Sequence, residues 1–219
     1  EKNSGLKSVK DFGLCVNPEF LREGQAISDF LDPKNTGIVV GESDTESGDV
    51  LVKLYAGFNG SVLRTFLRTA EMIKYARNAY LAKDVSFANE IANICSTFSI
   101  DYLDVKKGME MDSRIGEGRF LSAGLGYGGS CFKKDVSALI HRAESQGIEP
   151  NLLKEIEAVN EKQPTVILEL AKKALGNLKG KKIAVLGLAF KEKTDDVRES
   201  KAIKIIDLFL TNKAQVVVF

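Results

Sequence analysis

One short segment of this chain combines a single cysteine with glycines, lysines and an aspartate. It runs Gly124-Leu125-Gly126-Tyr127-Gly128-Gly129-Ser130-Cys131-Phe132-Lys133-Lys134-Asp135. Glycines let a backbone adopt positive φ and approach a ligand closely. The start of a helix and neighbouring cations both favour a thiolate, which is the nucleophilic form of cysteine. The pattern predicts a reactive thiol at Cys131, and the alternative is a small, inert, buried cysteine.

Other polar residues have spacings that suit the same chemistry. Lys74 and Asn78 lie four apart in a predicted helix, so they share a face and together suit an oxyanion. Glu19 follows a proline at the end of a predicted strand, where ligands of open sheets bind. Asp135 lies four residues after Cys131. The alternatives are a solvated helix face, a turn carboxylate and a charge that compensates the helix dipole.

The remaining cysteines and the single histidine suggest no further chemistry. Cys15 falls in a predicted strand and Cys95 on an apolar helix face, so both are assigned to the core. His141 has no partners for a metal site or a catalytic triad, and no metal site is predicted. Three cysteines without metal-type spacing suit a reducing compartment, which favours a cytoplasmic location.

Composition excludes several classes of function. The 219 residues are 44% hydrophobic and 28% charged, with a formal net charge of +1, as in ordinary soluble proteins. This balance points to neither a nucleic acid nor a membrane partner. No apolar stretch approaches the roughly 20 residues that a membrane span needs. The apolar run 215–219 ends the chain abruptly, and we expect the chain to be the middle of a longer protein.

The predicted elements follow hydrophobic periodicity and stop signals. Strands are expected at 12–16 and 37–41, and a helix at 47–58 capped by Ser47. A long helix capped by Thr69 is expected over 69–98. Further helices are predicted at 101–108, 135–146, 151–162 and 165–175, the last two separated by Pro164.

The final part of the chain has a different pattern. A strand at 183–187, a helix at 201–210 and a strand at 216–219 form a strand–helix–strand unit of the nucleotide-binding type. Polar residues 191–199 follow its first strand, where a nucleotide would dock, although a solvated charge run is the alternative. The fold class is α/β: a sheet remnant, a helical middle and the opening of a second sheet.

Four segments of the chain resemble the UDP-glucose/GDP-mannose dehydrogenase family. They are residues 17–24 (NPEFLREG), 70–81 (AEMIKYARNAYL), 126–135 (GYGGSCFKKD) and 190–200 (FKEKTDDVRES). The resemblance implies three domains. Residues 1–60 would be the C-terminal part of an NAD-binding Rossmann domain. Residues 61–163 would be an all-helical central and dimerisation domain with a long connecting helix. Residues 164–219 would be a linker helix and the start of a Rossmann-like UDP-sugar-binding domain.

The resemblance also implies an activity, which is the four-electron oxidation of a sugar C6 alcohol to a carboxylate with two NAD. Cys131 would attack the aldehyde, giving a thiohemiacetal that is oxidised to a thioester and then hydrolysed. Lys74 and Asn78 would stabilise the oxyanion. Asp135 would activate water, with Glu19 placed over the thioester.

Binding roles follow from the same resemblance. A homodimer or larger homo-oligomer is implied, with Arg114 reaching the nucleotide sugar of a neighbouring subunit. The implied substrate-binding residues are Phe20, Leu21, Arg114, Phe120, Tyr127, Gly128 and Lys191. The implied NAD-binding residues are Glu19, Lys134 and Arg198. Many members carry proline at the position of Lys133, and an additional lysine there would favour the thiolate further.

The substrate is expected to be UDP-glucose, whose product would feed polysaccharide precursor synthesis. GDP-mannose and UDP-N-acetylhexosamines are the alternatives within the family. A different class of function is an inactive structural or dimerisation core. The chain by itself is expected to be inactive, because most of the implied NAD-binding domain is missing from it.

Overall fold

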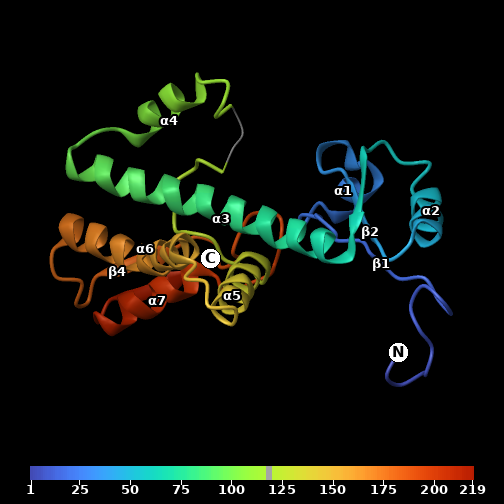
Figure 1. Ribbon diagram of the computed structural model, residues 1–219. Helices are drawn as coiled ribbons and strands as arrows, with labels where there is room; N and C mark the ends of the chain where they lie inside the picture. Colours follow the sequence, from blue (N-terminus) through green and yellow to red (C-terminus); the bar gives the residue numbers. More distant parts are fainter. Residues whose placement is uncertain (117–119) are drawn as a thin grey trace. The chain divides into compact units, whose positions relative to one another are not determined.

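The computed structural model describes residues 1–116 and 120–219 and consists of two compact units. The first unit is Glu1–Arg77 and the second is Asn78–Phe219. Helix α3, Leu67–Thr97, belongs to both, because the unit boundary falls within it (Figure 1). The two units are described separately below.

A three-stranded sheet in the order β1-β2-β3 organises the first unit. Strand β1 (Cys15–Val16) is antiparallel to β2 (Ile38–Glu42), which pairs in parallel with β3 (Val62–Phe66). The apolar residues at the start of β2 are buried, with Val40 fully covered. A short apolar run of this kind is typical of a strand covered on both faces. The predicted strand at 37–41 is therefore confirmed within one residue.

Helix α2 (Thr45–Leu54) connects the two parallel strands, and it begins two residues earlier than the sequence predicted. Its N-cap is Asp44, whose carboxylate accepts a hydrogen bond from the backbone N–H of Ser47. The prediction that Ser47 caps this helix is wrong. Both residues are good cap types, and the one that precedes the first helical turn takes the position.

Three elements of the first unit were not predicted: α1 (Ala26–Leu31), the 3-10 turn Pro33–Asn35 and strand β3. Strand β3 lies at the sheet edge and is largely exposed, so its sequence lacks the apolar alternation that identifies half-buried strands. Helix α3 follows β3 directly. The predicted cap Thr69 is therefore wrong, because it lies inside the first turn.

The second unit has a helical part whose core is formed by α3, α5 (Cys131–Glu144) and α6 (Asn151–Leu175). Its buried residues are Ala79, Ala82, Tyr127, Val136 and Ile156. Helix α5 is Cys131–Glu144 and starts four residues before the predicted 135–146. Helix α4 is Tyr102–Glu110, is capped by Asp101, and continues through Gly108, where the sequence predicted its end.

Helix α6 (Asn151–Leu175) is continuous through Pro164, so the prediction of two helices is wrong. Proline in a helix interior removes a hydrogen bond and normally costs about 3 kcal/mol. Packing on both sides of the proline offsets this cost. Ile156 is buried in the first core cluster, and Leu168 is buried in a second cluster with Leu178, Ile205, Phe209 and Ala214.

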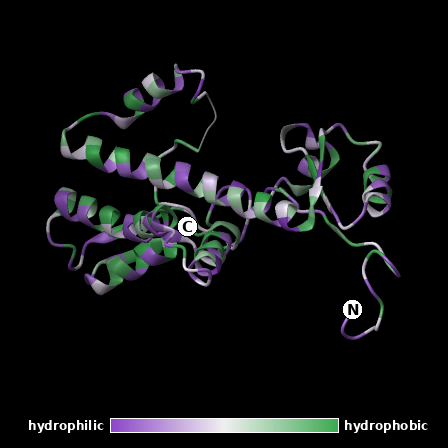
Figure 2. Cartoon of the chain, in the orientation of Figure 1, coloured by the Kyte–Doolittle hydropathy of each residue, from purple (hydrophilic) through white to green (hydrophobic). Residues whose placement is uncertain are grey.

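That second cluster supports the predicted strand–helix–strand unit. Strand β4 (Lys182–Val185) pairs in parallel with β5 (Gln215–Val218), and α7 (Lys201–Thr211) connects them. The expected α/β class with a helical middle is confirmed. Along α3 and α6, polar and apolar residues alternate (Figure 2). Within the described residues, no helix has the length and apolarity of a membrane span.

Candidate active site

Cys131 is the first residue of α5, and its side chain is exposed. Its Sγ lies 3.8 Å from the hydroxyl oxygen of Ser130. The sequence placed the cysteine near the start of a helix, and the structure puts it at the first helical position. At this position, the unpaired backbone N–H groups and the helix dipole stabilise negative charge.

Lys133 forms ion pairs with carboxylates of two segments that are distant in the sequence. Its ammonium nitrogen lies 2.7 Å from Glu199 and 3.6 Å from Glu161. The hydrogen bond to Glu199 is the main cause that raises the pKa of Lys133. Its charge is thus largely balanced by these two carboxylates, which weakens the expectation that Lys133 serves the thiol.

Asp135 lies one helical turn after Cys131 and is 2% exposed. Its Oδ2 accepts a hydrogen bond from Asn78 Nδ2 at 2.5 Å, and its Oδ1 pairs with Lys134. Asn78 is itself buried on α3. The helical spacing predicted that Asn78 shares a face with Lys74, and the structure adds a hydrogen bond from Asn78 to Asp135. A buried charge stabilised by an amide and an ammonium group is held in one orientation.

Within the first unit, Lys74 and Glu19 are hydrogen-bonded, which the sequence did not predict. Lys74 Nζ donates to the Glu19 carbonyl at 2.7 Å and to its carboxylate at 2.8 Å. The other carboxylate oxygen accepts from the backbone N–H of Leu21 at 2.8 Å. The guanidinium of Arg77 lies 3.7 Å from the centre of the Phe20 ring. The segment 19–21 is therefore anchored on the first turns of α3, and Lys74 lies one turn before Asn78.

Two glycines just before Cys131 lie closely against other segments of the chain. A Cβ at Gly128 would lie 2.6 Å from the Glu199 carbonyl oxygen, and one at Gly129 would lie 2.8 Å from the Phe190 ring. The backbone N–H of Gly129 also donates to the Arg198 carbonyl at 2.9 Å. The segment 190–199 thus packs directly on the cysteine loop, residues 124–130. Two of the four segments that carry the family resemblance, 126–135 and 190–200, therefore lie together in the fold.

Two aromatic residues, one before this loop and one in it, have different environments. Phe120 is 44% exposed, while Tyr127 is 6% exposed and its hydroxyl donates to Glu157. Their rings lie 6.3 Å and 5.7 Å from the Phe132 ring, respectively. Burial, with the bond to Glu157, strongly raises the pKa of Tyr127. The Tyr127 ring is therefore part of the core, and the substrate contact expected for Tyr127 stays a prediction.

A cavity of about 330 Å³ opens beside this loop. Lys191 lines it together with Leu125, Gly126, Phe190 and the buried Lys201. Elsewhere, Arg198 pairs with Asp196 at 2.6 Å and Arg114 pairs with Asp112 at 2.6 Å. Arg114 is highly exposed, with 87% of its side chain accessible. Lys191, one of the predicted nucleotide-contacting residues, thus lines a cavity close to the cysteine loop.

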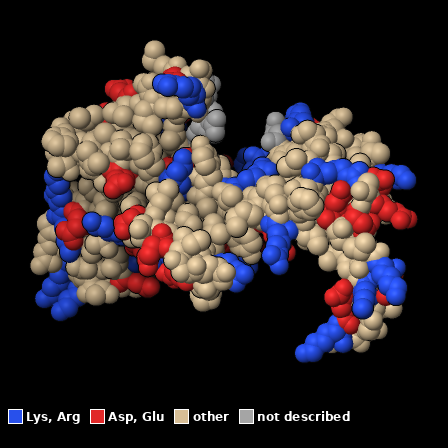
Figure 3. Space-filling view, viewed as in Figure 1, with Lys and Arg blue, Asp and Glu red and all other residues tan. Residues whose placement is uncertain are grey.

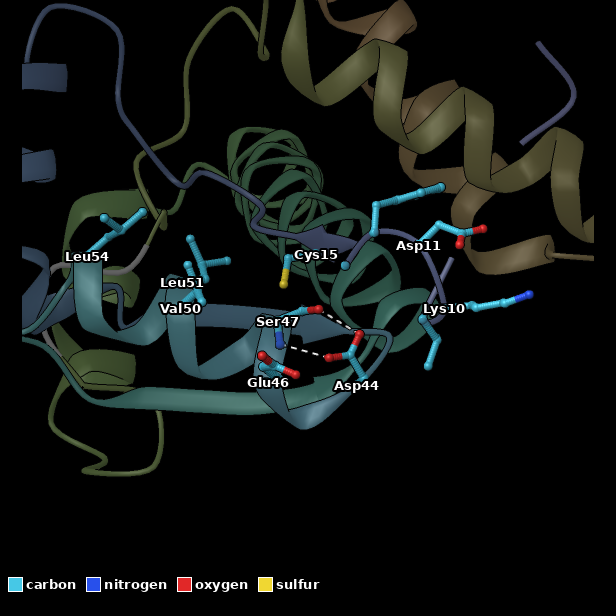
Figure 4. A pocket seen from close by; sticks show the side chains of 12 residues that line it. Lys10, Asp11, Cys15, Asp44, Glu46, Ser47, Val50, Leu51 and Leu54 are labelled. Carbon is cyan, nitrogen blue, oxygen red and sulfur yellow. Dashed lines mark hydrogen bonds between the residues drawn. The ribbon is translucent and has the colours of Figure 1, made fainter. Parts of the chain in front are cut away.

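Cys15 has a contrasting environment in the first unit (Figure 4). It is only half-buried and lines a cavity of about 550 Å³ with Asp11, Asp44 and Ser47, so its assignment to the core is corrected. Burial raises its pKa, and the carboxylates of Glu42 and Asp44 raise it further. Cys95 is buried as predicted, and His141 is exposed. No cluster of metal ligands occurs among the described residues.

Sequence reasoning missed a polar stripe on α6. Glu157, Asn160 and Gln163 recur at intervals of three, and the two amides are 1% and 4% exposed. Polar residues at helical spacing on an otherwise apolar face are the signal that identifies such a stripe. Asn160 and Gln163 form hydrogen bonds with the backbone of the cysteine loop.

Comparison with known proteins agrees with this geometry. Three models of the UDP-glucose/GDP-mannose dehydrogenase family match the chain. The NAD binding domain matches residues 1–59, the central domain 68–162 and the UDP binding domain 184–219. The chain belongs to this family. The central-domain match contains Lys74, Asn78, Cys131 and Asp135, and the UDP-binding match contains Lys191.

Individual relatives in the dehydrogenase family are similar along nearly the whole chain. UDP-glucose 6-dehydrogenase AglM of Haloferax volcanii is 46% identical, with 99% of this chain and 51% of that protein covered. A UDP-glucose dehydrogenase structure from Pyrobaculum islandicum has a TM-score of 0.90 and 41% identity, over 95% of this chain and 48% of that one. A UDP-D-ManNAc dehydrogenase structure from Pyrococcus horikoshii has a TM-score of 0.87 and 26% identity, covering 99% and 51%. The chain spans about half the length of the curated relatives it matches.

Proposed function

We propose that this chain carries the thiol chemistry of an NAD-dependent UDP-glucose 6-dehydrogenase, which oxidises UDP-glucose to UDP-glucuronate. One observation carries the proposal. An exposed cysteine begins α5, and a buried aspartate one turn later is hydrogen-bonded to Asn78 of α3. This arrangement combines a nucleophile, a carboxylate base and an amide donor. The sequence likeness to UDP-glucose 6-dehydrogenases favours UDP-glucose among the sugars of the family.

In the proposed mechanism, the Cys131 thiolate adds to the C6 aldehyde, forming a C–S bond and an oxyanion. Asn78 and, one turn away on α3, Lys74 would donate to that oxyanion. After oxidation of the resulting thiohemiacetal, water attacks the thioester carbonyl, and the C–S bond breaks to release the thiolate. Asp135 would take the proton from the attacking water. Glu19 is proposed to lie over the thioester while water attacks it.

The residues present fit a nucleotide cofactor in part. Strands β2 and β3 with α2 form a parallel unit of the kind that binds nucleotides at its strand ends. Glu19, Lys134 and Arg198 would hold NAD, and NAD when bound would supply the hydride acceptor for both oxidations. The matches to NAD-binding and UDP-binding domains support these two ligands.

Self-association is proposed as well. Tyr80, Phe87 and Ile94 are spaced by seven on α3 and are 51%, 44% and 49% exposed. Residues seven apart share one helix face, so α3 presents an apolar stripe of the kind that a second copy buries. The same stripe supports the alternative function, in which the chain is a structural core without activity.

Activity of the full gene product with UDP-glucose and NAD tests the proposal. We expect two NADH formed for each UDP-glucuronate, with GDP-mannose and UDP-N-acetylmannosamine oxidised much more slowly. Preference for one of the other sugars would reassign the substrate while keeping the chemistry. Absence of oxidation of all three sugars by a folded, self-associated protein would overturn the enzymatic function in favour of the structural one.

A further inference from the structure

Three buried side-chain amides surround the loop that precedes Cys131. They are Asn89 of α3 and Asn160 and Gln163 of α6, which are 0%, 1% and 4% exposed. Their hydrogen bonds go mainly to the loop backbone, at residues 33 to 39 positions away in the sequence. Asn160 and Gln163 pair both polar atoms of their amides, whereas Asn89 pairs its Oδ1 and its Nδ2 has no partner among the described residues. Buried amides favour such pairing, so the loop conformation and the two helices depend on one another.

Asn160 binds both peptide groups of Tyr127. The Tyr127 N–H donates to Asn160 Oδ1 at 2.7 Å, and Asn160 Nδ2 donates to the Tyr127 carbonyl at 3.2 Å. The Tyr127 hydroxyl donates to Glu157, which lies one turn earlier on α6. Helix α6 therefore holds this one loop residue at three points.

A second pair of contacts holds Gly124. Its N–H donates to Asn89 Oδ1 at 2.7 Å, and its carbonyl accepts from Gln163 Nε2 at 2.8 Å. Asn93 donates to Gln163 Oε1 at 3.1 Å, which fixes the orientation of that amide. Four main-chain groups of the loop are thus paired with three side chains from two helices.

Gly126, which lies between Gly124 and Tyr127, packs closely against Asn160. Gly126 has a φ of +95°, and a Cβ at this position would lie 2.5 Å from Asn160 Oδ1. Glycine is required here for two separate reasons, its backbone conformation and the contact with Asn160. The loop sequence and the α6 sequence are therefore matched at this point.

We propose that Asn160, with Gln163 and Asn89, is a positioning residue that sets the loop conformation from which Cys131 is presented. Tyr127 lies four residues before Cys131, and its ring also contacts Phe132, so a shift of this peptide moves the start of α5. The catalytic consequence rests on the proposed function. The structural clamp, meaning the bonds of these three amides to Gly124 and Tyr127, does not depend on it.

Hydrogen exchange and activity of the Asn160→Ala variant of the full gene product test this clamp. Asn151→Ala changes an exposed asparagine of the same helix, and Leu168→Ala removes a buried contact from the other core cluster. We expect backbone exchange in residues 124–131 to rise about tenfold in Asn160→Ala, since local opening sets that rate. Asn151→Ala should leave this segment protected from exchange. So should Leu168→Ala, when it is compared with Asn160→Ala at an equal loss of melting temperature. Unchanged exchange in Asn160→Ala would overturn the clamp.

Activity then tests positioning. We expect kcat for UDP-glucose to fall about 10- to 100-fold further in Asn160→Ala than in Leu168→Ala, because small misplacements of reacting groups slow chemistry. Equal kcat values with faster exchange would show that the clamp exists without a positioning role. If the unsubstituted protein oxidises no sugar, the proposed function fails. The rate of Cys131 alkylation by iodoacetamide then replaces kcat, and an unchanged rate overturns positioning.

A double-mutant cycle provides a second test. Gly126→Ala and Asn160→Ala act on one contact, so we expect the melting-temperature loss of the double variant to be smaller than the sum of the single losses. Gly147→Ala is the matched control, because Gly147 has a φ of +74° and open space around it. It should combine additively with Asn160→Ala. Additivity of the Gly126 pair as well would contradict the proposed contact.

Discussion

Cys15 in the first unit and Cys131 in the second have different surroundings. Cys15 lies in β1, is paired with Glu42 across the sheet and is close to Asp44, and burial and these carboxylates raise its pKa. Cys131 is exposed at the first position of α5 and precedes two lysines. Acidic and basic groups are intermingled on the visible surface as a whole (Figure 3). The difference at Cys15 comes from burial and from the nearby carboxylates of Glu42 and Asp44.

Cys131, the thiol of the proposed function, lines neither of the two cavities, whereas Cys15 lines the larger one. The larger of the two cavities described above lies beside Cys15, whose neighbours favour the neutral thiol. Cys131 is backed by a buried carboxylate and an amide. Four substitutions test this contrast.

The largest effect is expected for Cys131→Ser. Without a thiol no thioester forms, so kcat of the full gene product for UDP-glucose should fall at least about 10³-fold. Cys15→Ser is the matched control and should change kcat less than about twofold, since the proposed mechanism gives Cys15 no role and serine differs from cysteine by one atom. A Cys131→Ser variant with more than a tenth of the original rate would remove the distinction between the two thiols.

Asp135→Asn should come next. Loss of the base that activates water should slow turnover about 10²- to 10⁴-fold, and the sugar should remain bound to Cys131 as a thioester. Intact-protein mass spectrometry after mixing with substrate and NAD measures that adduct. Asp104→Asn, at an exposed carboxylate of α4, is the control. A slow variant without the adduct would assign Asp135 to an earlier step.

Glu161→Gln tests the charge network behind Cys131. Burial opposes ionisation of Glu161, but hydrogen bonds from Lys204 and Lys201 outweigh it and lower the pKa to about 2. A lowered folded-state pKa stabilises the protein above the unfolded value of 4.5, and this stabilisation is lost as pH falls toward 2. We expect the substitution to lower the melting temperature by about 2–4 °C near pH 6 and by less near pH 3. Glu169→Gln, at an exposed carboxylate of the same helix, should show little pH dependence. An equal loss at both pH values would contradict the role of ionised Glu161.

Asp44→Asn should have the smallest effect. Asparagine keeps the helix cap but removes a negative charge, so the pKa of Cys15 should fall. Alkylation of Cys15 by iodoacetamide at fixed pH should then be about two- to threefold faster, and alkylation of Cys131 should be unchanged. Asp11→Asn alters another carboxylate lining the same cavity and serves as the control. An equal acceleration in both variants would mean that access, not charge, limits Cys15.

Local sequence patterns predicted much of the fold and part of the site. The buried strand around Val40, the long helix and the final strand–helix–strand unit follow from hydrophobic period. Strand β3 could not be predicted because an exposed edge strand has no such period. The prediction of two helices in place of α6 is wrong because Pro164 usually ends a helix, whereas here packing on both of its sides keeps the helix continuous. Among site residues, Cys131 could be located from the sequence because the start of a helix depends on nearby residues.

The sequence alone determined the place of Cys131 at the start of a helix, the helix face shared by Lys74 and Asn78, and the family. Only the tertiary structure showed that Asn78 donates to Asp135, 57 residues away, and that Lys133 is balanced by Glu199. It also showed that the loop glycines accommodate Phe190, Glu199 and Asn160. The physical reason is the distance along the sequence over which each effect acts. Helix starts and periodicities arise within a few residues, whereas the partner of a buried polar group depends on which distant segment the folded chain brings within hydrogen-bonding distance.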